Sequence, residues 1–123
     1  MFNPGTLIVK PQSADLLEDL DTFGKMDPFV KVTIGSNSQQ TPPANGMGKK
    51  PSWNSVLTFK IAGEKAIEVS LWDYDSLTSN DYIGECTVQL QDVVSRGNFS
   101  NWYEVKKDGK SAGKVFLTFQ YSI

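Results

Sequence analysis

Five aspartates are the residues of this sequence best suited to chemistry. They are Asp21, Asp27, Asp73, Asp75 and Asp81. Three lie in the segment "WDYDSLTSNDYIGE", and two flank a glycine in "LDTFGKMDPFVKV". Side chains two apart on an extended chain point the same way. We therefore expect the carboxylates of Asp73 and Asp75 to face one spot. The intervening loop is long enough to bring Asp81 towards them.

Gathered carboxylates repel one another unless something neutralises them. Two charges near a protein surface about 4 Å apart repel by about 4 kcal/mol. Calcium removes this repulsion, because it takes oxygen ligands in a tolerant geometry. The main-chain carbonyl of Tyr74 and the hydroxyl of Thr78 can complete the shell. Each aspartate alone is more simply read as a turn former. The repeated pattern favours a shared calcium site, and it is not an EF-hand.

The composition narrows the function classes further. The chain has 123 residues and no histidine, which excludes Ser-His-Asp and Cys-His nucleophile pairs and imidazole zinc sites. A net charge of −2 excludes a strongly basic nucleic-acid binder. The lone Cys86 cannot form an internal disulfide, which favours a reducing cytosolic home. No segment has the ~20 consecutive apolar residues that a membrane span needs. Any association with a membrane would therefore be peripheral.

The elements that must hold these aspartates are short strands. Apolar and polar residues alternate with a period of two, and the runs are separated by Gly/Pro-rich turns. We predict strands at Thr6–Lys10, Phe29–Ile34, Ser36–Gln40, Ser55–Ile61, Ala66–Trp72, Tyr82–Leu90, Trp102–Val105 and Lys114–Ile123. A single helical turn is expected at Leu90–Gly97. The pattern predicts an all-β, eight-stranded antiparallel β-sandwich, forming a single domain over residues 1–123.

Three motifs resemble those of C2 domains, the calcium-dependent membrane-targeting β-sandwiches of protein kinase C and the synaptotagmins. Leu20–Val32 is similar to the family's first calcium loop, and Trp72–Glu85 to its third. Lys49–Phe59, "KKPSWNSVLTF", is similar to the family's Asn-Pro-x-Trp-Asn-Glu strand entry. Met26 and Ser55 depart from the family pattern at positions that are not ligands. The resemblance implies that all five aspartates bind calcium, and the order of elements resembles the type II, phospholipase-type, topology.

The resemblance also implies a membrane-binding surface. In the family, coordination positions left free on calcium accept lipid phosphate or carboxylate. Apolar residues in the loops insert into the bilayer, and basic residues contact anionic headgroups. The residues concerned here are Phe23, Lys25, Met26, Leu77, Lys49 and Lys50. Phe23 can equally fold back over its own loop. An ordinary solvated pair is a simpler reading of Lys49 and Lys50.

We therefore predict a calcium-dependent binder of anionic phospholipid membranes. It would be a cytoplasmic monomer that is recruited to the membrane surface when calcium rises. The alternative is a protein-interaction adaptor on the same fold, with weak or structural calcium binding. We predict no enzyme activity, since a two-metal hydrolase needs mixed ligands and a substrate pocket that this short chain shows no insertion to build. We predict no nucleic-acid binding, because no stripe of aromatic and basic residues is present.

Overall fold

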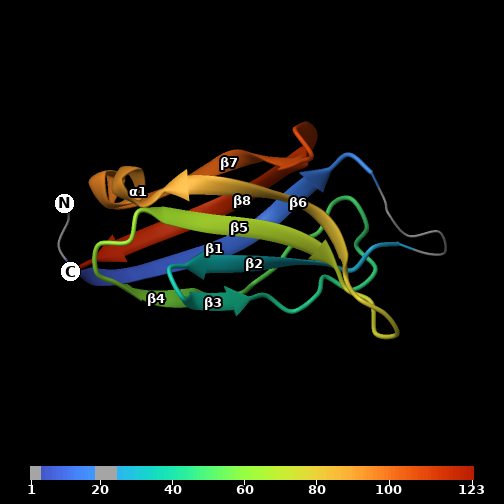
Figure 1. Ribbon diagram of the computed structural model, residues 1–123, viewed down its shortest axis with the longest axis horizontal. Helices are drawn as coiled ribbons and strands as arrows, with labels where there is room; N and C mark the ends of the chain where they lie inside the picture. Colours follow the sequence, from blue (N-terminus) through green and yellow to red (C-terminus); the bar gives the residue numbers. More distant parts are fainter. Residues whose placement is uncertain (1–3, 19–24) are drawn as a thin grey trace.

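Eight strands and one short helix make up the regular structure of the described residues (Figure 1). The computed structural model describes residues 4–18 and 25–123. The elements are β1 (Gly5–Leu16), β2 (Pro28–Ile34), β3 (Asn37–Gln40), β4 (Leu57–Ile61), β5 (Ala66–Asp73), β6 (Asp81–Gln89), α1 (Leu90–Arg96), β7 (Asn98–Lys107) and β8 (Lys110–Ser122). Every strand pairing among them is antiparallel. The predicted all-β class is confirmed.

The strands form two packed layers. The hydrogen-bonded order is β3-β2-β5-β6-β7-β8-β1-β4. Between β6 and β7 the described residues form a single register pair, Glu85 with Lys106, so the sheet folds over at this point. The two outer strands approach each other at the far edge, where the Gln39 side-chain amide donates to the Thr58 carbonyl at 2.6 Å. The result is a sandwich of β3-β2-β5-β6 against β7-β8-β1-β4. The type II order stays a prediction.

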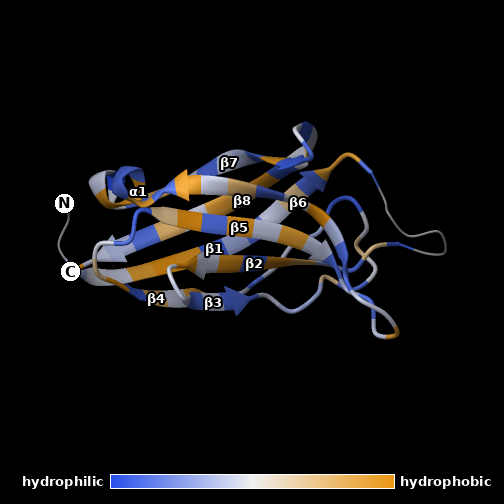
Figure 2. Ribbon diagram, viewed as in Figure 1, coloured by the Kyte–Doolittle hydropathy of each residue, from blue (hydrophilic) through white to orange (hydrophobic). Residues whose placement is uncertain are grey.

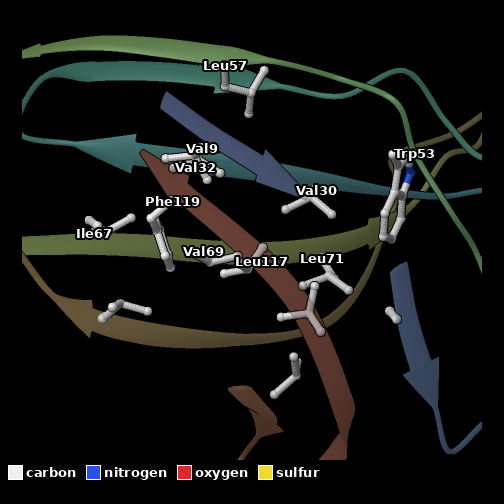
Figure 3. Close-up of a cluster of buried hydrophobic side chains, with 14 of the residues drawn as sticks. Val9, Val30, Val32, Trp53, Leu57, Ile67, Val69, Leu71, Leu117 and Phe119 are labelled. Atoms are coloured by element: carbon white, nitrogen blue, oxygen red, sulfur yellow. The ribbon is translucent and has the colours of Figure 1, made fainter. Parts of the chain in front are cut away.

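The core lies between these layers and follows the period-two pattern. Hydrophobic and hydrophilic bands alternate along β5 in Figure 2, and Ile67, Val69 and Leu71 are buried. They face Leu117 and Phe119 of β8 across the sandwich (Figure 3). Burying such a side chain stabilises the fold by ~1.5–3 kcal/mol. The alternation therefore selects which face of each strand turns inward.

Two strands are longer than their apolar runs indicated. β1 continues from Lys10 to Leu16, with a register shift between Pro11 and Ser13 where it pairs with β8. Proline has no N–H to donate, so a bulge lets the ladder continue past it. β7 spans Asn98–Lys107, although its exposed, polar positions carry little hydrophobic signal. The helical turn is as predicted, and β3 lies at the edge of the sheet.

One end of the sandwich collects the connections that follow β1, β3, β5 and β7. These four strands run in the same direction, so each connection leaves at the same end (Figure 1). The C-terminus lies at the other end. We call this collection of connections the loop end. Within the described residues, no helix is long and apolar enough to cross a bilayer.

Candidate calcium-binding site

The ends of β2, β5 and β6 bring three of the aspartates together at the loop end. Asp73 is the last residue of β5 and Asp81 the first residue of β6, and the two are register partners. Asp73 is also the register partner of Pro28, the first residue of β2. Asp27 directly precedes that proline. Strand pairing therefore places the backbones of Asp27, Asp73 and Asp81 next to one another at the loop end.

Asp27 and Asp73 are tied together by the backbone. The Asp27 N–H donates to Oδ1 of Asp73 at 2.9 Å, and the Tyr74 N–H donates to the Asp27 carbonyl at 3.0 Å. The carboxylate of Asp27 accepts from the Gly46 N–H at 2.6 Å. Asp73 is only 1% exposed. These bonds form what we call the aspartate base, a fixed pair of acids, Asp27 and Asp73, beneath the loops.

The connection between β3 and β4 supports the aspartate base. The Trp53 indole N–H donates to the Pro28 carbonyl at 3.0 Å, and the Ala44 N–H donates to the same carbonyl at 2.8 Å. The hydroxyl of the buried Thr41 accepts from the Val30 N–H at 3.0 Å. Together they hold the start of β2 in place. The sequence carries no local signal for Thr41, because its partner lies on another strand.

Asp75 is held differently, by its own loop. Oδ1 of Asp75 accepts from the N–H groups of Leu77 at 2.9 Å and Thr78 at 3.2 Å. Oδ2 accepts from the Thr78 hydroxyl at 2.9 Å. The Asp75 N–H donates to the side-chain oxygen of Asn80 at 2.9 Å. The Leu77 N–H, followed by the Thr78 hydroxyl, lowers the pKa of the Asp75 carboxyl below its ordinary value.

This arrangement differs from the expected convergence of Asp73 and Asp75. The extended strand ends at Asp73, so the alternation that would align the two carboxylates does not continue. Both oxygens of Asp75 are engaged by Leu77 and Thr78. Asn80, which the sequence reading missed, helps to shape this turn. Its only signal was an amide side chain, which commonly forms such turns, in a loop.

The described residues contain no group of three or more His, Cys, Asp or Glu side chains arranged to hold a metal. Asp21, predicted as a ligand, lies outside the described residues. The available donors are carboxylate, carbonyl and hydroxyl oxygens, which are the ligands that calcium prefers. The donor chemistry therefore fits calcium, but Asp75 must turn from its loop to join Asp73. The ligand roles of the Tyr74 carbonyl and the Thr78 hydroxyl stay predictions.

The predicted membrane residues fall into different environments. Leu77 is 91% exposed at the tip of the β5–β6 loop. Lys25, Lys49 and Lys50 are also exposed. Lys50 lies 3.7 Å from the Asp15 carboxylate, but both side chains are well solvated, so this ion pair contributes little.

Phe23 and Met26 were also predicted to contact the membrane. Phe23 lies outside the described residues. The prediction that Met26 contacts the membrane is wrong, because Met26 is fully buried in the core. Its carbonyl accepts from the Gly48 N–H at 3.0 Å, and its flexible side chain can fill space beneath the loops.

Cys86 is the one thiol of the chain and is not activated. Burial, and secondly the charge of Glu85, raise its pKa to about 12. A thiol in this state is protonated at neutral pH and is a poor nucleophile. The Cys86 side chain is partly buried against the core.

Comparison with known proteins agrees with this fold and set of motifs. The C2 domain family model matches residues 5–105. The chain is 34% identical to 16 kDa phloem protein 2 of Arabidopsis thaliana over 119 residues, covering 95% of this chain and 81% of that one. A solved "C2 domain-containing protein" is 33% identical with a TM-score of 0.84, covering 98% of this chain and 90% of that one.

A second solved structure supports the fold alone. It holds two C2 domains of extended synaptotagmin 2 with calcium bound, at 24% identity and a TM-score of 0.82. The match covers 95% of this chain and 45% of that one. The family model spans most of the chain, from β1 to β7, and the first relative is similar along nearly the whole length of this chain. The chain therefore belongs to the C2 domain family.

Proposed function

We propose that this protein binds anionic phospholipid membranes in a calcium-dependent manner. The observation that carries the proposal is the placement of Asp27, Asp73 and Asp81 at one end of a C2 fold. Asp75 follows on the adjoining loop. The protein would act as a binding module rather than an enzyme, as a cytoplasmic monomer recruited to membranes.

The aspartates explain why calcium would control this binding. Without a cation, the acids of the loop end repel an anionic bilayer. Bound calcium would supply positive charge and positions for anionic lipid oxygens. Asp27 and Asp73 are held by backbone hydrogen bonds and would form the fixed part of the site. Asp75 lies in the β5–β6 loop and Asp81 begins β6, and these two acids would complete the site.

Calcium binding should depend on Asp75 and Asp81. We expect calorimetric titration of calcium into metal-free protein to give binding that Asp75→Asn/Asp81→Asn abolishes. The Asp75→Asn change keeps an oxygen acceptor for the Leu77 and Thr78 N–H groups, so the loop should keep its shape. Glu68→Gln/Asp92→Asn is the matched control, since it removes two exposed acids away from the loop end. Equal calcium affinity in the two double variants would contradict the proposal.

Membrane contact should depend on Leu77. Burying one such side chain in the acyl region contributes ~1.5–3 kcal/mol, so Leu77→Ser should weaken binding to phosphatidylserine-containing vesicles about tenfold or more. Calcium affinity in the absence of vesicles should be unchanged. Co-sedimentation with and without a calcium chelator measures both the calcium dependence and the leucine effect. Protein that binds calcium yet stays in the supernatant would favour the protein-interaction adaptor instead.

A further inference from the structure

A pair of lysines flanks the turn of the β7–β8 hairpin. Asp108 and Gly109 form its two-residue turn, with φ of 52° and 78°. Left-handed backbone at both central positions is typical of the Asp-Gly turns that close tight hairpins. Lys107 and Lys110 are register partners on either side of this turn. Both are exposed.

Among the described residues, these two lysines form no ion pair, although two acids, Glu18 and Asp108, line the same cavity. Like charges directly opposite each other on paired strands are destabilising. The other hairpin lysines have partners: Lys106 lies 3.6 Å from a Glu104 oxygen, and Lys114 lies 4.5 Å from the ring centre of Trp102. An anionic surface would relieve the repulsion that remains at the tip.

The hairpin lies at the loop end, the same end of the sandwich as the candidate calcium loops. It follows β7, so it turns at the loop end (Figure 1). The Leu17 N–H donates to the Ala112 carbonyl at 3.0 Å, which joins β8 to the start of the β1–β2 connection. Ile83 of β6, two residues after Asp81, lines the same cavity as Lys107 and Lys110. The lysine pair can therefore approach the surface that the aspartate loops would approach.

We propose that Lys107 and Lys110 form a second, calcium-independent contact with an anionic bilayer. This inference rests on the proposed membrane function and adds a surface to it. The lysines line a cavity of about 290 Å³, together with the apolar side chains of Leu17 and Ile83. Glu18 and Asp108 share its lining, so the cavity is a poor trap for a free phosphate ion. A broad anionic surface suits two long, exposed lysine side chains better.

Vesicle binding of a lysine variant tests this contact. The change is Lys107→Gln/Lys110→Gln, and the matched control is Lys60→Gln/Lys65→Gln, which removes two exposed lysines towards the other end of the sandwich. Vesicles of phosphatidylcholine with and without phosphatidylserine are used, in calcium and in chelator, at low and high salt. Thermal unfolding of each variant checks that the fold is kept.

In calcium and low salt, the hairpin variant should bind phosphatidylserine vesicles roughly five- to thirtyfold more weakly than wild type. The control should match wild type, and the difference should shrink at high salt. Lys107→Glu/Lys110→Glu should have a larger effect. Calcium affinity measured without vesicles should remain that of wild type.

Each other outcome separates the two proposals. Calcium-dependent binding that is equal in the hairpin variant and wild type would overturn the hairpin contact alone. Vesicle binding that is equal in calcium and in chelator but is lost in the hairpin variant would support the hairpin contact. It would contradict the proposed calcium dependence. Absence of binding to phosphatidylserine vesicles in every condition would overturn both.

Discussion

Asp73 and Asp75 are two residues apart in sequence, yet they lie in different environments and have different hydrogen-bond partners. Asp73 belongs to the aspartate base, where it is 1% exposed and bound to the backbone of Asp27, 46 positions away in sequence. Asp75 lies on the loop, where its carboxylate accepts from residues two and three positions ahead. One acid is placed by the sandwich and the other by its own turn. In the proposed calcium site, Asp73 would be the fixed ligand and Asp75 the one that moves.

The difference has a physical cause. β2 pairs with β5 up to Asp73, and Trp53 and Ala44 close over the start of β2. Beyond Asp73 the described chain pairs with no strand until Asp81 begins β6. A local turn stabilised by an aspartate is the common solution for such a segment. Movement of Asp75 would therefore disturb local hydrogen bonds within one loop, while movement of Asp73 would disturb the sandwich.

Trp53→Ala should produce the largest loss of stability, because it removes the support of the aspartate base. Truncating a buried Trp costs about 3–5 kcal/mol, and the Pro28 carbonyl also loses a donor. Urea unfolding should show this loss as a lower midpoint. Trp53→Phe keeps most of the volume and should lose less. If alanine were tolerated with little change, the aspartate base would not depend on this residue.

Asp73→Ala should have an intermediate effect. It leaves the Asp27 N–H without its acceptor, which costs about 1–3 kcal/mol when the group is buried. Asp73→Asn keeps a side-chain oxygen and should be the more stable of the two. The comparison uses the free energy of unfolding from urea titration in metal-free buffer. Equal stability of the two variants would show that the carboxylate oxygen is not a structural acceptor.

Thr78→Val should have the smallest effect on stability, within about 0.5 kcal/mol, since the loop is exposed. Its effect on the Asp75 pKa is the sharper readout. Loss of the hydroxyl donor should raise that pKa towards its ordinary value, but the N–H groups of Leu77 and Thr78 should still hold it lower. NMR titration of the Asp75 carboxyl carbon measures this. An unchanged pKa would mean that the hydroxyl bond does not form in solution.

The pH dependence of this loop has a definite sign. A carboxyl whose pKa is lower when folded stabilises the folded state above the unfolded pKa, and this contribution is lost as pH falls through the folded pKa. For Asp75, whose folded pKa is lowered, acidification should therefore loosen the Leu77–Thr78 turn. Urea unfolding across the acidic range should show a weaker dependence on pH in Asp75→Asn than in wild type.

Much of the fold was predictable from short-range pattern. Alternation indicated the buried faces of β4, β5 and β8, and aspartate spacing indicated that one end of the sandwich would be acidic. β7 was underestimated because its positions are mostly exposed. Met26 was misplaced because its neighbours in sequence are polar loop residues, while its packing partners come from the core.

The sequence by itself determined the all-β class, the inward faces of β4, β5 and β8 and the family resemblance, because these depend on residue periodicity and on motifs within short windows. Tertiary structure decided the burial of Met26 and the acceptor role of Thr41. It also decided that Asp73 bonds to the backbone of a distant strand while Asp75 bonds within its own loop. It also placed the lysine hairpin at the same end of the sandwich as the aspartate loops. These features depend on where strands end and on which distant segments they meet, and alternation along one strand carries no information about either.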